Sequence, residues 1–146
     1  MTEFLFALIL ATVAGLAMAV QGSLNSVLGK NIGQLEATLI VHVVGIMVVA
    51  LLLMFKLGHG DFSKFGQAPW YVYLGGIINV LIIYGVLASI PRLGVAVATT
   101  AIIVGQVSTA LVIDHFGLFG LDKICFTWYK CFGLILLAAG TRLMLN

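Results

Sequence analysis

Long stretches of apolar residues follow one another along this chain with few polar interruptions. Five stretches reach the roughly 20 residues that a helix needs to cross a bilayer, and we expect helices over residues 4–28, 35–55, 69–90, 93–113 and 125–145. None of them alternates apolar and polar residues as the strands of a membrane barrel do. The pattern therefore predicts an all-α integral membrane protein, in which residues 1–146 form a single domain of five transmembrane helices.

The predicted connections between these helices are short. Residues 29–34 join the first two helices and residues 91–94 join the third and fourth. Connections of this length make successive helices antiparallel neighbours. Pro69 suits the first turn of the third helix, where a missing N–H costs nothing. The longest loop, residues 56–69, leaves no extramembrane domain large enough for an active site.

Composition agrees with a membrane protein and removes several other classes of function. The chain is 62% hydrophobic and 8% charged, against roughly 25% charged residues in a soluble domain. Its net charge is only +2 and its basic residues are scattered singly, so we expect no nucleic-acid partner. Cys125 and Cys131 fit no metal or disulfide spacing. We find no HExxH, GxSxG or P-loop motif and expect no enzyme activity, metal or cofactor.

The basic residues are almost evenly divided between the two faces of the predicted helix array. Four lie on the side of the amino terminus and three on the other: Lys56, Lys64, Lys123 and Lys130 against Lys30, Arg92 and Arg142. The positive-inside rule therefore predicts almost no preference for one orientation, and insertion is either weakly biased or occurs in both orientations. Two copies of a five-helix chain inserted oppositely would pair as an antiparallel dimer, which reproduces the inverted repeat of larger transporters.

Four of the predicted helices carry a strongly polar side chain within about 8 Å of their midpoints, namely Gln21, His42, Asn79 and Gln106. Asn25 lies one turn beyond Gln21 on the same helix face, near the helix end. Each residue has an ordinary alternative: the amides as interhelical hydrogen bonds, Asn25 as a helix-end residue, and His42 as a neutral hydrogen-bonded core residue. The functional roles open to His42 are substrate ligand and proton carrier. Because such bonds need only one or two pairs, polar groups on four helices favour a lined cavity.

Carboxylates are missing from the middle of every predicted helix. A site for a permanently cationic substrate, balanced by a central acidic residue, is therefore not expected. Asp114 and His115 lie at the end of the fourth helix, where we expect an interfacial cap or gate contact, with a deep ion site as the alternative. Neutral or zwitterionic solutes suit the polar residues better.

Small residues recur at helical spacing on the first and fifth helices. Gly15 belongs to a stripe of small residues four apart, and Gly133 and Gly140 lie seven apart on the fifth helix. Small side chains let helix backbones approach closely in membranes. We expect these glycines to mark helix packing, within a subunit or between subunits.

Four segments of the chain resemble one known family. They are QGSLNSVLG (21–29), PWYVYLGG (69–76), IPRLG (90–94) and VGQVSTALVIDHFGLFG (104–120), and the last is the most specific. Together with the number and spacing of the helices, they resemble the short five-helix, YdcZ-type branch of the drug/metabolite transporter superfamily. The resemblance covers essentially the whole chain.

The resemblance implies a multi-pass protein of the bacterial inner membrane that forms half of a ten-helix EamA-like transporter. It implies that such halves work as antiparallel homodimers or with a homologous half. It also implies that the first four helices of each half wall the substrate cavity, with the fifth outside. The matching positions are Gln21, Asn25, Gln106, Asp114 and His115, whereas the roles of His42 and Asn79 rest on depth alone. Unlike the small multidrug resistance relatives, the chain has no acidic residue inside its first helix.

We therefore expect a transporter, in the export direction, of small organic solutes by alternating access. The solute would bind between two copies at the membrane midplane, through hydrogen bonds from Gln21, Asn25, Asn79 and Gln106, with His42 as a further ligand or proton carrier. Two alternatives stay open: a small dual-topology ion channel, and an accessory subunit that does not transport. A channel would need a continuous polar path, whereas these residues cluster at mid-depth.

Overall fold

The computed structural model describes residues 2–144, and all regular secondary structure in that range is helical. Within residues 2–144, four helices are long and apolar enough to cross a membrane. These observations confirm the all-α membrane class. The chain divides into two compact units, one up to Pro91 and one from Arg92 onward, and we describe each unit by itself.

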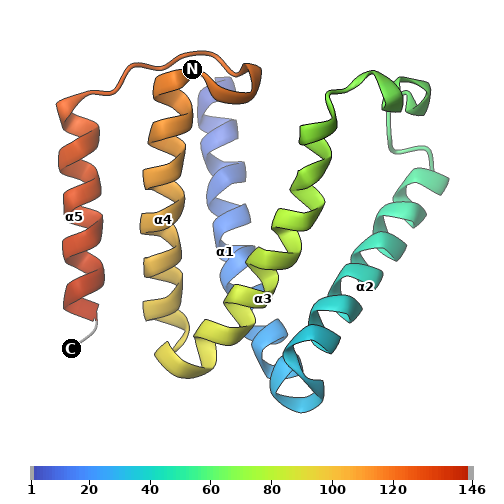
Figure 1. The fold of residues 1–146 in the computed structure, drawn as a ribbon, viewed down its shortest axis with the longest axis horizontal. Coiled ribbons are helices and arrows are strands. Elements are labelled where there is room, and N and C mark those ends of the chain that lie inside the picture. Colours follow the sequence, from blue (N-terminus) through green and yellow to red (C-terminus); the bar gives the residue numbers. More distant parts are fainter. Residues whose placement is uncertain (1, 145–146) are drawn as a thin grey trace. The chain divides into compact units, whose positions relative to one another are not determined.

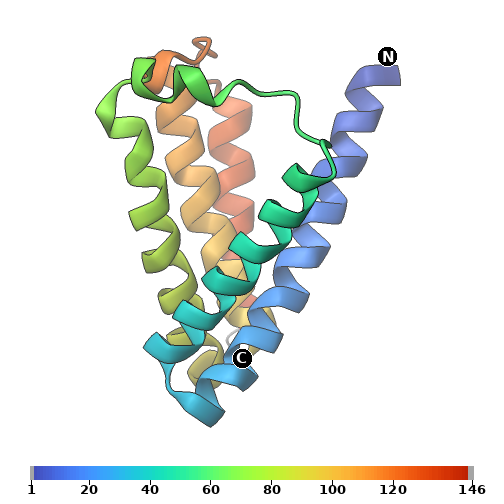
Figure 2. The ribbon, with the colours of Figure 1, turned by 90° about the vertical axis from the view of Figure 1, so that its right-hand side faces the viewer.

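The first unit is built on α1 (Thr2–Ile32), α2 (Gln34–Met54) and most of α3 (Gly75–Leu93). Helix α1 packs through its second half, where its buried residues Gly22, Asn25, Ser26 and Gly29 lie. Helix α2 returns beside this part of α1, as predicted from the short connection (Figures 1 and 2). Helix α3 meets them through side chains of its middle and second half, among them Ile83 and Leu87. The apolar first half of α1 stays exposed, which suits lipid or another protein surface in a bilayer.

The core of this unit is small and depends on two glycines of α1. Ala37, Ile83 and Leu87 form its buried cluster. A Cβ atom at Gly29 would lie 3.0 Å from Cδ2 of Leu87, and one at Gly22 would lie 3.1 Å from the side chain of Val86. The two glycines therefore let α3 approach α1 more closely than any other residue would allow.

Both short connections consist of a single glycine, which corrects the predicted loops. Helix α1 continues through Ile32, so that Gly33 alone leads into α2, and α3 continues through Leu93, so that Gly94 alone leads into α4. Gly33 has φ +103° and ψ 151°, and Gly94 has φ +80° and ψ 161°. Such dihedral angles are essentially restricted to glycine. Pro91 lies inside the last turn of α3 instead of in the link.

The loop between α2 and α3 is partly ordered by two short 3-10 helices, η1 (Phe62–Gln67) and η2 (Trp70–Leu74). The Asp61 carboxylate accepts a hydrogen bond from the backbone N–H of Ser63 at 2.9 Å and caps η1. The Tyr73 hydroxyl donates to the carbonyl of Phe65. The third helix therefore starts as a 3-10 turn after Pro69 and becomes α-helical only at Gly75, five residues later than residue 70, where the 3-10 turn begins.

The second unit contains α4 (Val95–Phe116), the short turn η3 (Leu118–Gly120) and α5 (Trp128–Met144). Helices α4 and α5 lie side by side in both views (Figures 1 and 2). Gly117 ends α4 in the left-handed conformation, with φ +61°. The chain then crosses to α5 as an extended segment held by a 2.8 Å hydrogen bond from the N–H of Ile124 to the carbonyl of Asp114.

This extended segment corrects the start of the fifth helix, which lies at Trp128 instead of residue 125. The predicted end at Leu145 lies outside the described residues. The 17 residues of α5 span about 25 Å, which is shorter than the roughly 30 Å of a bilayer core. A fifth membrane span therefore stays a prediction.

Candidate functional site

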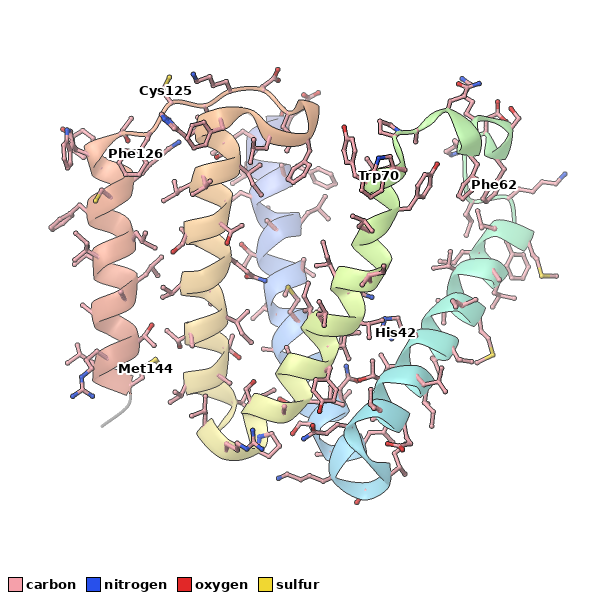
Figure 3. All side chains as sticks on the ribbon, in the orientation of Figure 1. His42, Phe62, Trp70, Cys125, Phe126 and Met144 are labelled. Atoms are coloured by element: carbon pink, nitrogen blue, oxygen red, sulfur yellow. The ribbon has the colours of Figure 1, made fainter. Side chains whose placement is uncertain are left out.

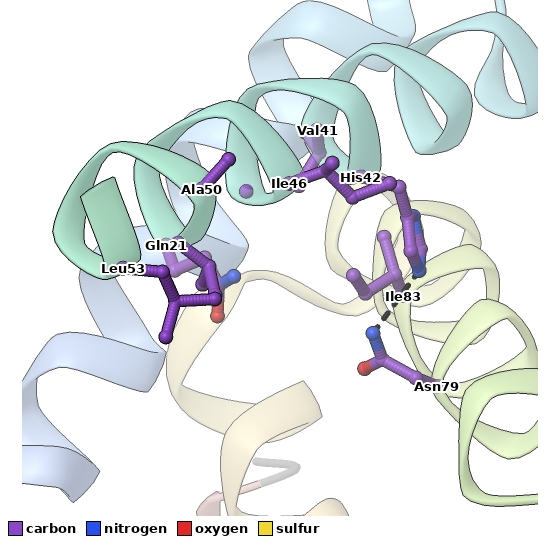
Figure 4. Close-up of a pocket in the computed structure, with 10 residues that line it drawn as sticks. Gln21, Val41, His42, Ile46, Ala50, Leu53, Asn79 and Ile83 are labelled. Atoms are coloured by element: carbon purple, nitrogen blue, oxygen red, sulfur yellow. Dashed lines mark hydrogen bonds between the residues drawn. The ribbon is translucent and has the colours of Figure 1, made fainter. Parts of the chain in front are cut away.

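A groove between α2 and α3 in the first unit collects three of the predicted polar residues (Figure 4). Its volume is about 530 Å³, and its polar lining residues are Gln21, His42 and Asn79. The rest of its lining is apolar: Val41, Gly45, Ile46, Val49, Ala50, Leu53 and Ile83. The groove thus combines three uncharged polar side chains with an apolar wall, which is the composition of many small-molecule sites.

His42 links the two helices that form the groove. Its Nδ1 atom lies 2.7 Å from the carbonyl oxygen of Thr38, one turn earlier on α2. Its Nε2 atom lies 3.0 Å from the side-chain nitrogen Nδ2 of Asn79 on α3. Figure 3 shows the ring of His42 directed toward α3. The imidazole therefore has a hydrogen-bonding partner at each nitrogen.

The three polar residues of the groove lie close to the middle of their helices. Counted from the midpoints of the apolar spans Thr2–Ile32, Gln34–Met54 and Trp70–Leu93, Gln21 lies about 6 Å, His42 about 3 Å and Asn79 about 4 Å along the helix axis. Gln21 and Asn79 are exposed on the described chain, and Gln21 forms no side-chain hydrogen bond with residues 2–144. An amide that faces hydrocarbon without a partner costs several kcal/mol, so in a bilayer the Gln21 amide needs water, a solute or another protein surface.

Asn25 does not line the groove. It is buried, with 8% of its surface exposed, on the part of α1 that packs against the rest of the unit. The neighbouring Ser26 is 3% exposed. The structure thus separates Asn25 from the group formed by Gln21, His42 and Asn79.

Gln106 belongs to the second unit, at the midpoint of α4, and is exposed. It lines a shallow pocket of about 410 Å³ whose other polar side chain is that of Thr109. Asp114 and His115 lie in the last turn of α4. The Asp114 carbonyl and the Nδ1 atom of His115 accept hydrogen bonds from the extended segment, the latter from the N–H of Phe126 at 3.3 Å. Both residues therefore anchor the connection to α5.

The glycines predicted to mark helix packing lie on open surface in the part of the chain that the structure describes. A Cβ atom at Gly15, Gly133 or Gly140 would meet no other atom within 4 Å. Their role in packing, within a subunit or between subunits, stays a prediction.

Sequence reasoning missed Thr38 and the apolar wall of the groove. The carbonyl of Thr38 fixes the ring of His42, and the spacing of four residues between them was the available signal. The wall residues on α2 recur every three or four residues after His42, as residues on one helix face do. Within residues 2–144, no group of three or more His, Cys, Asp or Glu side chains could hold a metal ion.

A family model described as "Putative inner membrane exporter, YdcZ" matches residues 6–143 of the chain. The chain belongs to this family. Together with the four long apolar helices, this membership identifies a multi-pass protein of the inner membrane and supports export as the activity of the YdcZ-type chain. Comparisons with curated proteins and with solved structures gave no match.

Proposed function

We propose that this YdcZ-type protein exports small neutral or zwitterionic organic solutes by alternating access, as an antiparallel homodimer of two five-helix halves. The observation that carries the proposal is the groove between α2 and α3, where Gln21 and Asn79 present exposed amides at mid-depth against an apolar wall. Gln106, at the middle of α4 in the second unit, and Asn25, buried on α1, are further proposed ligands of the solute.

The side-chain amides of Gln21 and Asn79 favour a bound solute, because their hydrogen-bonding groups are not all paired within the described residues. Hydrogen bonds between helices satisfy polar groups in membranes, and His42 and Asn79 do satisfy one another in part. Gln21 has no such partner in the described chain. A hydrogen-bonding solute or a second copy of the chain would satisfy it, and a site formed between two copies offers both.

The lining of the groove argues for an uncharged or internally balanced solute. It contains no Asp, Glu, Lys or Arg. A net charge on the solute would stay uncompensated at mid-depth, which is expensive in hydrocarbon. The apolar wall on α2 supplies the contact surface for a hydrophobic part of the solute.

An antiparallel pair is favoured by the nearly even division of basic residues between the two sides. The exposed first half of α1 and the open glycines of α5 provide apolar surface with small residues, which suits close contact between helices of two copies. Asp114 and His115, at the end of α4, would then lie near the mouth of the cavity as gate contacts. Two opposed copies would give the ten-helix inverted repeat of larger transporters.

The solute site is tested in an efflux-deficient bacterium. Expression of the wild-type chain should raise tolerance to one or more compounds in a panel of neutral and zwitterionic growth inhibitors. Gln21→Leu and Gln106→Leu should each abolish that tolerance at unchanged membrane levels. Gln67→Leu, the same exchange in the extramembrane loop, is the matched control. Full tolerance in both the Gln21→Leu and the Gln106→Leu variant would refute the site, and ion conduction at channel rates in liposomes would favour a channel instead.

The antiparallel arrangement is tested with two reporters fused to the carboxyl terminus. Green fluorescent protein reports a cytoplasmic end and alkaline phosphatase a periplasmic one. Comparable signals from both fusions are expected. A single orientation would refute the homodimer and would leave pairing with a homologous half of opposite orientation.

A further inference from the structure

The two hydrogen bonds of His42 determine which of its nitrogens carries the proton. The carbonyl oxygen of Thr38 can only accept a hydrogen bond, so Nδ1, 2.7 Å away, must be the donor. A neutral imidazole has only one N–H, so Nε2 must be an acceptor. The side-chain nitrogen of Asn79, 3.0 Å from Nε2, is therefore the donor of the second bond.

The orientation of the Asn79 amide follows from this assignment. With Nδ2 donating to His42, the oxygen Oδ1 lies on the other side of the amide, away from the imidazole (Figure 4). In the neutral state of His42, Asn79 thus presents a hydrogen-bond acceptor to the groove. Gln21 lines the same groove with an amide that can donate or accept.

Protonation of His42 reverses this arrangement. A proton from the aqueous phase adds to the lone pair of Nε2, and the ring then donates at both nitrogens. The Nδ2 group of Asn79 cannot accept that bond, so the amide must turn over and offer Oδ1 to the ring. The donor Nδ2 then faces the groove next to a positive charge. One O–H bond of a hydronium ion is broken, one N–H bond is formed, and a water molecule is left in the aqueous phase.

We propose that His42 and Asn79 form a proton-dependent switch of hydrogen-bonding polarity in the groove. In the neutral state the groove binds an uncharged solute that carries a hydrogen-bond donor on an apolar body. Protonation of His42 turns the Asn79 acceptor away from the groove and weakens the binding of that solute, so proton and solute oppose one another. The solute class rests on the proposed function, whereas the switch itself does not.

The surroundings of His42 contain no competing charge. The groove residues contributed by α1, α2 and α3 include no Asp, Glu, Lys, Arg, Cys or Tyr and no second histidine. His42 is therefore the titratable group of this lining. The charge that it gains has Asn79 as its side-chain hydrogen-bonding partner.

The switch is tested by nitrogen NMR of the full chain in lipid nanodiscs. The chain has three histidines, so His59→Gln and His115→Gln leave His42 as the single histidine signal. At pH 8.5 we expect Nδ1 protonated and Nε2 bare. On acidification to pH 5, Nε2 should gain a proton, and the side-chain amide of Asn79 should shift along the same pH curve. The buried amide of Asn25, which lies outside the groove, is the internal control and should stay unchanged.

Three results would overturn the switch. They are the opposite tautomer at pH 8.5, an Asn79 amide that stays unchanged while His42 gains its proton, and a His42 that stays neutral down to pH 5. A merely structural histidine would give one of these results. None of them depends on whether the protein transports anything.

The solute class is tested with indole and 1-methylindole, which share an apolar body and differ in one N–H donor. At pH 8.5, indole should bind more tightly by roughly 2- to 13-fold, the range of one ordinary hydrogen bond. The preference should fall at pH 5 and in Asn79→Leu, and Gln67→Leu, in the extramembrane loop, should retain it. Equal binding of the two probes at pH 8.5 would overturn the solute class. Probe binding and export in the efflux-deficient bacterium are measured independently, so failure of the solute class can be distinguished from failure of the proposed function.

Discussion

The contact between Gly29 of α1 and Leu87 of α3 permits a quantitative test of how this small core is held together. Leu87 is 1% exposed and is the largest fully buried side chain of the described chain. A bilayer gives no hydrophobic driving force between helices, so their association depends on van der Waals packing. Leu87→Ala therefore loses mainly the cavity contribution, on the order of 1–3 kcal/mol of the free energy of unfolding.

Gly29→Ala has two opposed effects in the same place. The new Cβ would lie 3.0 Å from Cδ2 and 3.5 Å from Cγ of Leu87, and overpacking of this kind costs about 1–3 kcal/mol. Alanine in place of glycine inside a helix recovers about 0.5–1 kcal/mol. When Leu87 is already alanine the clash is gone, so Gly29→Ala should then stabilise the protein by about 0.5–1 kcal/mol.

The two substitutions should therefore be coupled by about 1–3 kcal/mol in a double-mutant cycle. The assay is reversible unfolding in mixed micelles, followed by circular dichroism. Gly45→Ala is the matched control, because a Cβ there meets no atom within 4 Å in the described structure, and its effect should be the same with Leu87 or Ala at position 87. Additive effects of Gly29→Ala and Leu87→Ala would refute the close approach of α1 and α3.

Two further predictions concern the ordered segments outside the spans. Gly117 and Gly120 both have positive φ, +61° and +83°, but only at Gly117 would a Cβ meet a backbone atom, the carbonyl oxygen of Leu121 at 3.0 Å. Gly117→Ala should therefore lower the thermal unfolding midpoint more than Gly120→Ala does. Gly120→Ala carries only the conformational cost of roughly 1–2 kcal/mol. Equal effects of the two substitutions would contradict the close contact at Gly117. Hydrogen bonds from the side chain and backbone of Ser63 lower the pKa of the Asp61 carboxyl below its ordinary value. Ser63→Ala should raise that pKa toward the ordinary value in a carbon NMR titration. Because the folded-state pKa is depressed, the stabilisation of the loop is present above the ordinary pKa and is lost as the pH falls through the lower value.

Helix positions were predictable because runs of about 20 apolar residues have few structural alternatives in a bilayer. The helix ends were less predictable. Pro91 was expected in the link, but α3 includes it because only two more helical residues follow, so few helical hydrogen bonds depend on it. Pro69 was expected to open an α-helix, but the first turn after it is a 3-10 helix. Both differences concern one turn of chain, where local and tertiary preferences are similar in size.

The depth of the polar residues was also readable from the sequence, whereas their grouping was not. Gln21 and Asn25 are four residues apart and share a face, but four residues rotate by about 40° around the helix. That rotation is enough for Gln21 to face the groove while Asn25 is buried. His42 and Asn79 are 37 residues apart, and no spacing rule connects positions on two helices separated by a loop.

The sequence by itself determined that the protein is helical, resides in a membrane and belongs with inner-membrane exporters, because apolar length and local motifs are properties of consecutive residues. It also determined that uncharged polar groups lie at mid-depth. Only the tertiary structure decided which of them share a groove, and that the ring of His42 lies between the carbonyl of Thr38 and the side-chain amide of Asn79. These features depend on the angle and distance between α2 and α3, and that geometry arises from side-chain packing across helices.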